Sequence, residues 1–456
     1  MRKLVEFQIL DKNAEHYGVS MSELMQNAGN EISRYIMENY SSDDVITIVC
    51  GKGNNGGDGF VCAFNLIDTG FKVNILIAEP PSSEISIPYY KKLEDKVTEM
   101  SFLSKFKDET GLLVDCLLGS GITGNPRSPY DEYIEEMNNF ENILSVDVPS
   151  GFLSQCSVEP RNTITFHDLK EGMNEENCGE IVIRDVGIPK EIELKTGPGE
   201  LLLYPKWNPK KHKGQNGKVA VIGGGPFKGA PALAGLGAYR GGADLVHVFV
   251  PESSYQSVSG FIPELIVHSC PGDLIDSNCV DLIQSLNIEF DSYVIGPGIG
   301  KNSLTKEAIQ LMIDTFENIV LDADAIEGYN FSGNILVTPH AGEIGRLVSD
   351  KSENSMKYFA KKNSLTILMK GKEDIITDGN QIKYNSTGHA RMAVGGTGDV
   401  LAGLCGALLA KGLTPFESGR LAAYSIGLAG ESAYQEFGSG FLPTDLALSL
   451  SKILEG

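Results

Sequence analysis

The feature that most constrains this fold is a repeated pairing of short apolar runs with glycine- or aspartate-rich ends. In the first half these runs are VITIVC at 45–50, VNILIA at 73–78, LLVDCLLGSG at 112–121 and ILSVDVPSG at 143–151. Segments with helical spacing, such as 20–38, lie between them. Apolar strands that end in polar loops indicate a parallel sheet whose functional groups gather at the strand C-termini.

The second half restarts the pattern after a change of composition at 204–218, where two prolines, a cluster of lysines and the only tryptophan occur. We predict a linker there, which divides the chain into domains 1–205 and 206–456. The strand-like runs that follow are KVAVIGGG, ADLVHVFVP, SYVIGPGIG, NIVLDADA, NILVTPH and LTILMKG. A glycine loop at 395–399 then opens a helix of small residues, so a second α/β domain is expected.

Composition excludes several classes of partner. The chain has 456 residues and a formal charge of −22, which disfavours nucleic acid and anionic membranes as partners. The N-terminus lacks the apolar core of a signal peptide, and the longest apolar stretch, 400–410, is too short to span a bilayer. None of the eight cysteines forms a C-x-x-C pair, and several lie in apolar runs, so a cytoplasmic protein is expected.

The loop GGTGD at 395–399 carries the clearest chemical pattern. Gly395, Gly396 and Gly398 would let backbone amides approach an oxyanion, and a helix from Val400 onward would direct its positive end at the same point. Asp399 could accept a proton from an attacking hydroxyl there. The same letters are compatible with a tight strand-to-helix turn in which Asp399 only caps the helix.

Five further segments follow strand-like runs of the second half, namely GPFKGAP (225–231), GPGIG (296–300), LDADA (321–325), VTPHAGE (337–343) and MKGKED (369–374). Asp322 and Asp324 could cap a helix or help place a metal–phosphate pair. His340 taken alone is more typical of a structural histidine. Lys370 and Lys372 could meet a phosphate chain or lie in a solvated turn.

In this order, these segments resemble the ribokinase-like superfamily and, more closely, the ADP/ATP-dependent NAD(P)H-hydrate dehydratases, over about residues 205–456. The resemblance implies a ribokinase-like α/β domain that phosphorylates the hydroxyl of hydrated NADH or NADPH and then expels phosphate to restore the ring double bond. It implies ADP as donor, because fused two-domain chains are the prokaryotic arrangement, together with Mg²⁺. Assembly into a homo-oligomer is also implied.

The same resemblance assigns residues to the dehydratase. Asp399 would be the base on the hydroxyl, and the amides of 396–398 would stabilise the transferring phosphoryl group. The hydrate would contact Ala230, Gly298, His340 and Asp399. The nucleotide would contact Lys370, Gly371, Lys372, Glu373, Asp374, His389, Ala390, Arg391, Met392, Ala393, Val394, Gly395, Gly396, Thr397 and Gly398.

Three segments of the first half form a comparable set. NNGGDG (54–59) suits a phosphate-binding turn, although it is equally typical of a surface turn. DCLLGSGITG (115–124) and VDVPSG (146–151) place Asp115 and Asp147 at the ends of apolar runs. Two carboxylates beside glycine loops at one sheet edge indicate a ligand crevice.

Together with ELMQNAG (23–29), TFHDLKEG (165–172) and GEIVIRDVGIP (179–189), these segments resemble the NAD(P)H-hydrate epimerase family over roughly residues 1–205. The resemblance implies a Rossmann-like doubly wound sheet that interconverts the R and S hydrates. One departure is that only LSQCSVEPRN (153–162) follows VPSGF, where the family usually carries a longer, more acidic segment.

The epimerase resemblance also assigns residues. Asp147 would be the acid/base that inverts C6, through loss and return of the hydroxyl. K⁺ would bind near Asn55, Asp115 and Ser150, through oxygen ligands suited to a hard cation. The hydrate would contact Asn54, Asn55, Gly56, Gly57, Asp58, Gly119, Ser120, Gly121, Ile122, Thr123, Gly124, Asn125 and Asp147.

Several functions compete on the sequence. A fusion of the two activities is coherent, since an epimerase would supply the S hydrate that the dehydratase consumes, and both NADH hydrate and NADPH hydrate carry the reacting ring. A ribokinase-like small-molecule kinase with an N-terminal nucleotide-binding or interaction module is the alternative. An ordinary NAD dehydrogenase is disfavoured, because no G-x-G-x-x-G follows the first strand.

Overall fold

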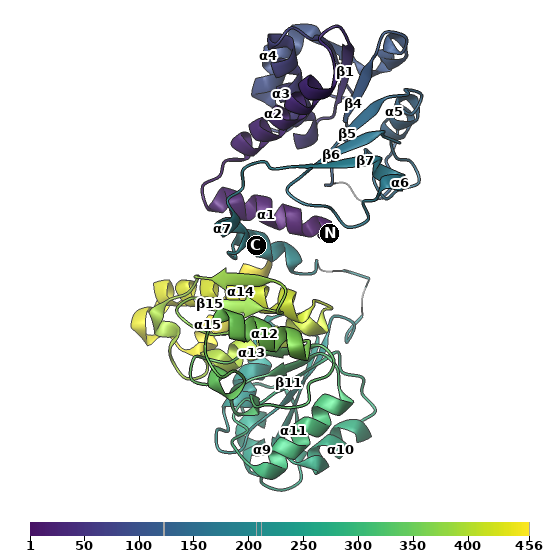
Figure 1. Ribbon diagram of the computed structural model, residues 1–456. Coiled ribbons are helices and arrows are strands. Elements are labelled where there is room, and N and C mark those ends of the chain that lie inside the picture. The colour runs from purple at the N-terminus through teal and green to yellow at the C-terminus, as the bar shows by residue number, and fades with distance from the viewer. Residues whose placement is uncertain (122–123, 207, 211, 456) are drawn as a thin grey trace. The chain divides into compact units, whose positions relative to one another are not determined.

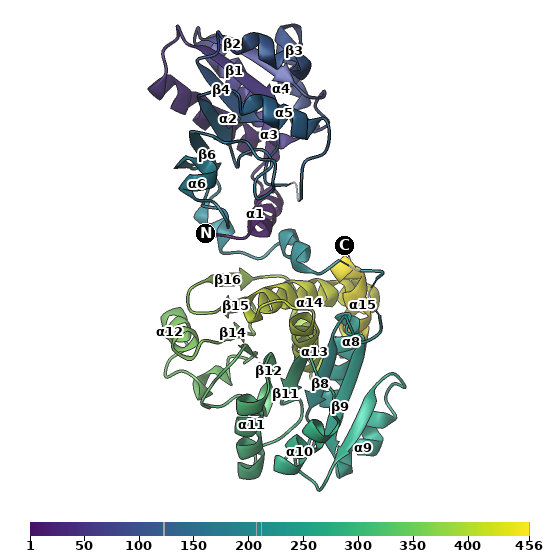
Figure 2. The same cartoon turned by 90° about the vertical axis from the view of Figure 1, so that its right-hand side faces the viewer.

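The computed structural model describes residues 1–121, 124–206, 208–210 and 212–455. The chain divides into two compact units, Met1–Glu193 and Leu194–Gly456 (Figures 1 and 2). The sequence placed the division at 205/206. The 3₁₀ helix Pro198–Leu203, which lies before that point, is part of the second unit. No helix in the described part of the chain is long and apolar enough to cross a membrane.

The first unit is built on a seven-stranded sheet in the order β3-β2-β1-β4-β5-β6-β7, in which neighbouring strands are all parallel. This confirms the expected doubly wound, Rossmann-like arrangement, whose strand order reverses direction between β1 and β4. The strands are β1 Val45–Cys50, β2 Lys72–Ile77, β3 Val97–Glu99, β4 Leu112–Cys116, β5 Ile143–Val146, β6 Asn162–Phe166 and β7 Glu180–Arg184.

Helices cover both faces of this sheet. Helices α2 and α3 contribute to the apolar core on one face, and α5 contributes to the core on the other. The helices are α1 Leu4–His16, α2 Met21–Asn39, α3 Asn54–Asp68, α4 Ile87–Leu93, α5 Tyr130–Met137, α6 Glu175–Cys178 and α7 Lys190–Glu193. In the register of β1 and β4, Cys50 pairs with Cys116, so the loops after these strands leave the sheet side by side.

The second unit has a nine-stranded sheet in the order β10-β9-β8-β11-β12-β13-β14-β15-β16. Neighbours from β10 to β14 are parallel, and β15 and β16 extend the sheet as antiparallel strands that the sequence did not predict. The strands are β8 Lys218–Ile222, β9 Leu245–Pro251, β10 Ile266–Cys270, β11 Ser292–Ile295, β12 Ile319–Leu321, β13 Ile335–Val337, β14 Thr366–Met369, β15 Asp374–Thr377 and β16 Ile382–Asn385.

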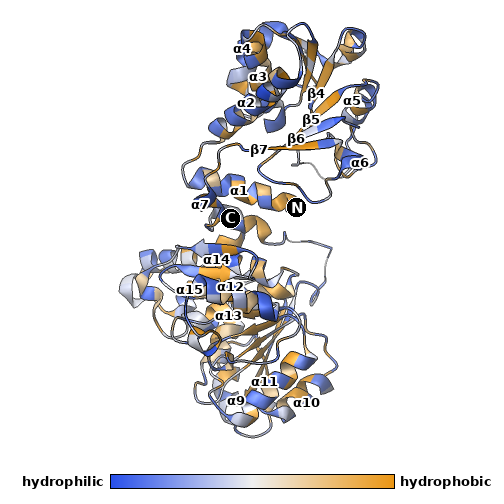
Figure 3. Cartoon of the chain, viewed as in Figure 1, coloured by the Kyte–Doolittle hydropathy of each residue, from blue (hydrophilic) through white to orange (hydrophobic). Residues whose placement is uncertain are grey.

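Two apolar cores lie on opposite faces of this second sheet. One is formed with α8, α13, α14 and α15, and the other with α10, α11 and α12. The helices are α8 Ala230–Arg240, α9 Glu252–Ser259, α10 Ser277–Ser285, α11 Ser303–Thr315, α12 Glu353–Asn363, α13 Thr397–Ala410, α14 Pro415–Phe437 and α15 Pro443–Glu455. Figure 3 shows mixed hydrophobic and hydrophilic colour on the covering helices α10 and α11, as expected for amphipathic helices.

Three local features differ from the sequence-based expectation. Helix α1, which was not predicted, precedes α2. Helices α3 and α13 begin at Asn54 and Thr397, inside motifs that were expected to form loops. Cys270 and Cys279 form a disulfide between β10 and α10, whereas no cysteine pairing was anticipated.

Candidate active sites

The motif NNGGDG forms the start of helix α3, so the expectation that residues 54–59 form a turn is wrong. Its glycines permit close packing instead. A Cβ atom on Gly56 would overlap the carbonyl of Gly51, and one on Gly57 would overlap the side chain of Met25 in α2. The helix therefore approaches both the end of β1 and helix α2 more closely than any side chain at these positions would allow.

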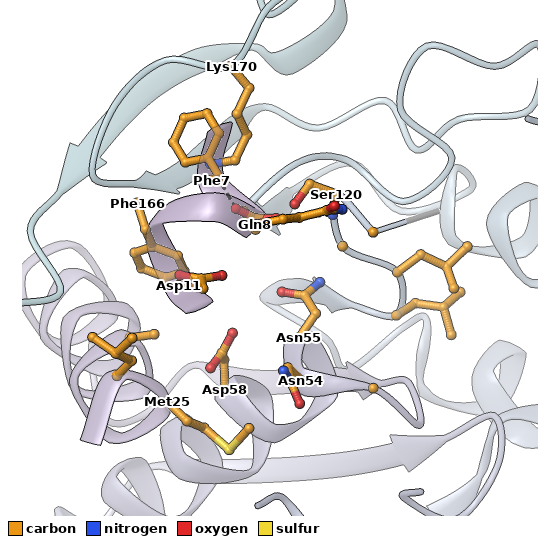
Figure 4. Close-up of a pocket in the computed structure, with 18 of the residues that line it drawn as sticks. Phe7, Gln8, Asp11, Met25, Asn54, Asn55, Asp58, Ser120, Phe166 and Lys170 are labelled. Atoms are coloured by element: carbon orange, nitrogen blue, oxygen red, sulfur yellow. Dashed lines mark hydrogen bonds and ion pairs between the residues drawn. The ribbon is translucent and has the colours of Figure 1, made fainter. Parts of the chain in front are cut away.

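A cavity of about 920 Å³ lies at the strand ends of the first unit (Figure 4). Its walls come from α1, α2, the start of α3, the loops after β4 and β5, and residues 166–170. Figure 4 shows Asp11 of α1 and Asp58 of α3 directed toward the same space, with Asn55 beside them and Phe166 and Met25 at its apolar side. The cavity combines an apolar wall with converging polar groups, as ligand sites do.

Asp147 is held by an ion pair with Lys170 inside this cavity. The Lys170 ammonium lies 2.8 Å from the Asp147 carboxylate, and the backbone N–H of Ser120 donates to the same carboxylate at 3.1 Å. Lys170 is 1% exposed, donates to Thr165 at 2.7 Å and lies 4.4 Å from the centre of the Phe7 ring. The ion pair fixes the orientation of a carboxylate that follows β5, as predicted.

Two further carboxyl groups lie near this pair. Burial, together with the Asp147 and Asp11 carboxylates, raises the pKa of Asp58 well above its ordinary value of 3.8. Burial and the charge of Asp147 raise the pKa of Asp11 to about 6, and the positive charge of Lys170 opposes this rise. Asp11 can therefore give and take a proton near neutral pH within this cavity.

The residues proposed as K⁺ ligands differ in whether they line the cavity and in whether their side chains have hydrogen-bond partners. Asp115 accepts from the hydroxyls of Ser150 (2.5 Å) and Ser145 (2.9 Å) and from the backbone N–H of Ser150 (2.8 Å). Burial raises the pKa of Asp115, and these hydrogen bonds oppose the shift. The Asn55 side-chain amide is buried, and neither its oxygen nor its nitrogen has a hydrogen-bond partner among the described residues. Only Asn55 of the three lines the cavity.

Most of the residues assigned to the epimerase do line the cavity, but not all. Those that line it are Asn54, Asn55, Asp58, Gly119, Ser120, Gly121, Gly124, Asn125 and Asp147. Gly56 and Gly57 are not among the lining residues, because they pack α3 against β1 and α2. Ile122 and Thr123 lie outside the described residues. Residues 153–162, the shorter segment, do not belong to the lining.

Sequence reasoning missed two contributors to this cavity. Phe7, Leu10 and Asp11 of α1 belong to its lining, and their i, i+3, i+4 spacing was the available signal for a shared helix face. Lys170 was quoted only as part of a motif. Its position after β6 gave no indication that it would pair with Asp147.

In the second unit, the GGTGD motif spans the start of α13. Gly396 is the N-cap with φ +105°, a conformation that favours glycine, and the helix begins at Thr397, three residues earlier than expected. A Cβ atom at Gly396 would lie 2.6 Å from Leu233 and 2.9 Å from Pro443. The first amides of a helix have no partner within it, so those at the start of α13 can donate to a ligand there, although the Thr397 N–H also donates to the Val394 carbonyl at 3.5 Å.

Asp399 lies in the first turn of α13, within a cluster of charged groups. Burial and the charge of Asp322 raise the pKa of Asp399 from 3.8 to about 7, and the charge of Lys370 opposes this. The Lys370 ammonium lies 2.7 Å from Asp322, which also accepts from the Thr338 hydroxyl at 2.8 Å. Burial lowers the pKa of Lys370, but the carboxylates of Asp322, Glu343 and Asp399 outweigh it, so the pKa is raised.

Strand order explains why these residues meet. Asp322, Thr338 and Lys370 directly follow β12, β13 and β14, which are neighbours in the parallel part of the sheet. The ammonium of Lys370 also lies 3.4 Å from where a Cβ of Gly398 would stand. One cation therefore connects the strand ends to the start of α13.

Ala230 and Gly298, two of the residues expected to contact the hydrate, lie close together. Gly298 has φ +72°, and a Cβ atom there would overlap the Phe227 carbonyl and lie 3.1 Å from the Cβ of Ala230. Ala230 begins α8. His340 follows β13 and is exposed, and its ring accepts from Gly342 N–H at 2.8 Å and lies 3.3 Å from Glu343.

The residues expected to contact nucleotide fall into two segments. In the first, the Asp374 carboxylate accepts from Gly371 N–H (2.9 Å) and from the Asn385 amide (3.0 Å), which fixes the turn 370–374. In the second, the His389 ring stacks on Tyr434 at 3.6 Å. The Thr397 hydroxyl and the Arg391 Nε are buried without a hydrogen-bond partner in the described chain.

Comparisons with known sequences cover almost the whole chain. Residues 219–452 match the family model described as NAD(P)H-hydrate dehydratase, and residues 21–172 match the model described as YjeF-related protein N-terminus. A bifunctional NAD(P)H-hydrate repair enzyme of Archaeoglobus fulgidus is 36% identical over 98% of this chain and 97% of its own length. One of Methanothermobacter thermautotrophicus is 36% identical over 99% of this chain and 95% of its own.

Among solved structures, a ribokinase-like superfamily protein from Enterococcus faecalis V583 superposes with a TM-score of 0.51. It is 22% identical, and the match covers 57% of this chain and 95% of that protein. This likeness confirms the ribokinase-like fold that was expected for one of the two units.

Proposed function

This chain belongs to the family of bifunctional NAD(P)H-hydrate repair enzymes, and from that membership we propose that it restores hydrated NADH and NADPH in two reactions. The first unit epimerises the R and S hydrates. The second unit dehydrates the S hydrate with ADP and releases AMP and phosphate. The geometry that supports the second reaction best is the position of Asp399 at the start of α13, beside Lys370.

In the proposed dehydration, Asp399 takes the proton of the hydroxyl on C6 as its oxygen attacks the β-phosphorus of ADP. AMP leaves with the electrons of the broken P–O bond. The C6–O bond then breaks, phosphate departs, and loss of a proton from C5 restores the C5=C6 double bond. Phosphate leaves far more readily than hydroxide, which is why the nucleotide is consumed.

The other residues of the second unit hold charge and position in this proposal. Lys370, anchored by Asp322, compensates negative charge on the phosphates, and the amides at the start of α13 contact the transferring group. Ala230, Gly298 and His340 contact the hydrate. The segments 370–374 and 389–398 contact the nucleotide, where the unpartnered Thr397 hydroxyl and Arg391 Nε offer hydrogen bonds.

Mg²⁺ bound with ADP would neutralise charge that develops on the phosphoryl oxygens. This ion usually retains several waters and is held largely by the phosphates. The described residues contain no cluster of three or more His, Cys, Asp or Glu suited to a metal ion. Asp322 and Asp399 are the carboxylates beside Lys370 that could contact such an ion or its waters.

In the proposed epimerisation, the hydroxyl leaves C6 with a proton from the protein, and water returns on the other face. Asp147 is the acid/base that we assign to this step, held in place by Lys170 and by the Ser120 N–H. Asn54, Asn55, Asp58 and residues of the 119–125 loop contact the hydrate. If Asp147→Asn epimerises at the wild-type rate, this assignment is wrong.

K⁺ is proposed for the first unit, with oxygen ligands from Asn55, Asp115 and Ser150. The buried Asn55 amide, which no described residue satisfies, supports a ligand at this position, since an unpaired buried amide is costly. A K⁺ ion would balance the buried carboxylate of Asp115 and orient Asn55 toward the hydrate. The ion is also expected to stabilise the unit.

A paired assay tests both activities. Purified R and S hydrates of NADH and NADPH are each incubated with the full chain, with and without ADP or ATP. We expect NADH absorbance to return from the S hydrate with ADP, accompanied by AMP and phosphate, and R to be consumed only as it converts to S. A stable phosphorylated product would instead support the ribokinase-like small-molecule kinase.

Water labelled with ¹⁸O tests the proposed route of inversion. Loss and return of the hydroxyl incorporates one solvent oxygen at C6 per inversion. Inversion without label would exclude this route. Homo-oligomer formation, which the family resemblance implies, is measured independently by light scattering during size-exclusion chromatography.

A further inference from the structure

Helix α1 supplies part of the cavity of the first unit, although the family match begins only at residue 21. Phe7, Leu10 and Asp11 lie on one face of this helix and belong to the cavity lining. Leu10 also packs in a small apolar cluster with Leu24 and Ala28 of α2, which fixes α1 at this position. Asp11 is therefore held at the cavity by the packing of its own helix.

The Asp11 carboxyl group is available to a ligand. Figure 4 shows it directed toward the cavity, facing Asp58 of α3. Among the described residues, none forms a hydrogen bond or salt bridge with the Asp11 side chain, whereas Asp147 is engaged by Lys170 and Ser120. An acidic group that lines a cavity without a protein partner is free to exchange a proton with whatever binds there.

The charges around Asp11 favour the protonated form of its carboxyl group. Asp58 and Asp147 are the neighbouring carboxyls, and Lys170 is the buried cation, already paired with Asp147 at 2.8 Å. The other titratable lining residues are Lys52, which pairs with Glu79, His167, which pairs with Glu193, and Tyr130 and Arg127. Three carboxyls thus share one buried cation, which agrees with the rise in the pKa of Asp11 to about 6.

We propose that Asp11 is a second proton-transfer residue of the epimerase site, acting on the oxygen at C6 together with Asp147. The proposal rests on the epimerase function proposed above. Inversion requires the oxygen to leave from one face of the ring and to return on the other. Two carboxyls on different elements, α1 and the loop after β5, can reach the oxygen from separate directions, which one carboxyl cannot do.

The steps balance with these two groups and water. One carboxylic acid gives its proton to the hydroxyl, the C6–O bond breaks as the N1 lone pair forms a C6=N1 double bond, and water departs. Water then adds to the other face, and the second group, as carboxylate, takes the proton. In the reverse direction the two groups exchange roles. Asp58, half-buried at the cavity and with its pKa raised well above its ordinary value, suits a hydrogen-bond donor to the hydrate better than a proton shuttle.

The test compares Asp11→Asn with Glu15→Gln in the full chain. Glu15 lies on the same helix, is exposed and does not line the cavity, so its substitution makes the same change of charge outside the site. The rate of R-to-S conversion, corrected for the spontaneous rate, is measured from pH 5 to 8, together with dehydration of pure S hydrate. Thermal unfolding reports on the fold.

We expect Asp11→Asn to lower kcat/KM for epimerisation by about 10²-fold or more, to remove the wild-type pH dependence near 6, and to leave dehydration of the S hydrate unchanged. Glu15→Gln should match the wild type in all three. A folded Asp11→Asn that epimerises like the wild type, or that only raises KM, would overturn the role of Asp11 and leave the epimerase function standing. A wild-type chain without epimerase activity would instead overturn the proposed function itself.

Discussion

Replacing Asp399 by asparagine should abolish dehydration while making the second unit more stable at alkaline pH. The two effects share one cause, since burial and the charge of Asp322 penalise the ionised carboxylate that the reaction needs. A positioned general base contributes about 10²- to 10⁴-fold to a rate, so kcat should fall by at least about 10²-fold. Asparagine keeps the shape of the side chain and loses only the ability to accept the proton.

The pKa of about 7 sets the pH profile of the wild type. A base with this pKa is about 10% ionised at pH 6 and about 90% at pH 8, so the dehydration rate should rise about tenfold over this interval. An aspartate at its ordinary value of 3.8 would give a flat profile there. Asp322→Asn should move the rise to lower pH, because it removes a repulsive charge.

Stability should change with the opposite sign. A carboxyl whose pKa is higher in the folded than in the unfolded state loses stability as pH rises from 3.8 through about 7. A shift of about three pH units corresponds to at most about 4 kcal/mol, and the partial exposure of Asp399 reduces this. Asp399→Asn should therefore melt several degrees above the wild type at pH 8 and equally with it at pH 4.

Asp281→Asn, an exposed change on helix α10, controls for the loss of one negative charge in the same unit. The measurements are NADH absorbance from the S hydrate with ADP, and scanning calorimetry at pH 4 and pH 8. Retention of substantial activity by Asp399→Asn, or a flat wild-type profile between pH 6 and 8, would refute the role of Asp399 as base. Equal melting of wild type and variant at pH 8 would refute the burial penalty.

Three other predictions concern neighbouring residues. Lys370→Met should abolish dehydration and lower the free energy of unfolding by about 3–5 kcal/mol, because Asp322 is left buried without its cation. Calorimetry measures the stability, and the epimerase rate of the same chain serves as the control. Unchanged stability would contradict the ion-pair argument. Gly396→Ala should destabilise the second unit by about 1–3 kcal/mol, since φ is +105° and a Cβ would press on neighbouring side chains. Gly395→Ala should be tolerated, because nothing lies within 4 Å of a Cβ there, and urea titrations of the two variants measure the difference. Asn55→Ala should remove any difference in thermal stability between KCl and choline chloride, whereas a wild-type chain that is insensitive to K⁺ would contradict the proposed ion.

The strand ends of both sheets could be located from sequence because their pattern is local. Apolar, β-branched runs that stop at a glycine or aspartate identified β1, β4 and β5 in the first unit and the parallel core of the second. Parallel strands bring such ends to one edge, so Asp147 could be assigned to a candidate site before any coordinates. Asp399 was assigned from its glycine motif at the start of a helix. The limits of α3 and α13 could not be assigned in the same way, because glycines read as loop residues unless the helix that packs against them is known.

The sequence by itself thus determined the fold class, the family and most of the residues at the strand ends, since these depend on local periodicity and on motifs. Tertiary structure alone decided which charges meet. Helix α1 brings Asp11 to the cavity, Lys170 folds back onto Asp147, and Lys370 lies between Asp322 and Asp399. The physical reason is that a pKa depends on burial and on charges a few ångströms away, and neither is encoded by distance along the chain.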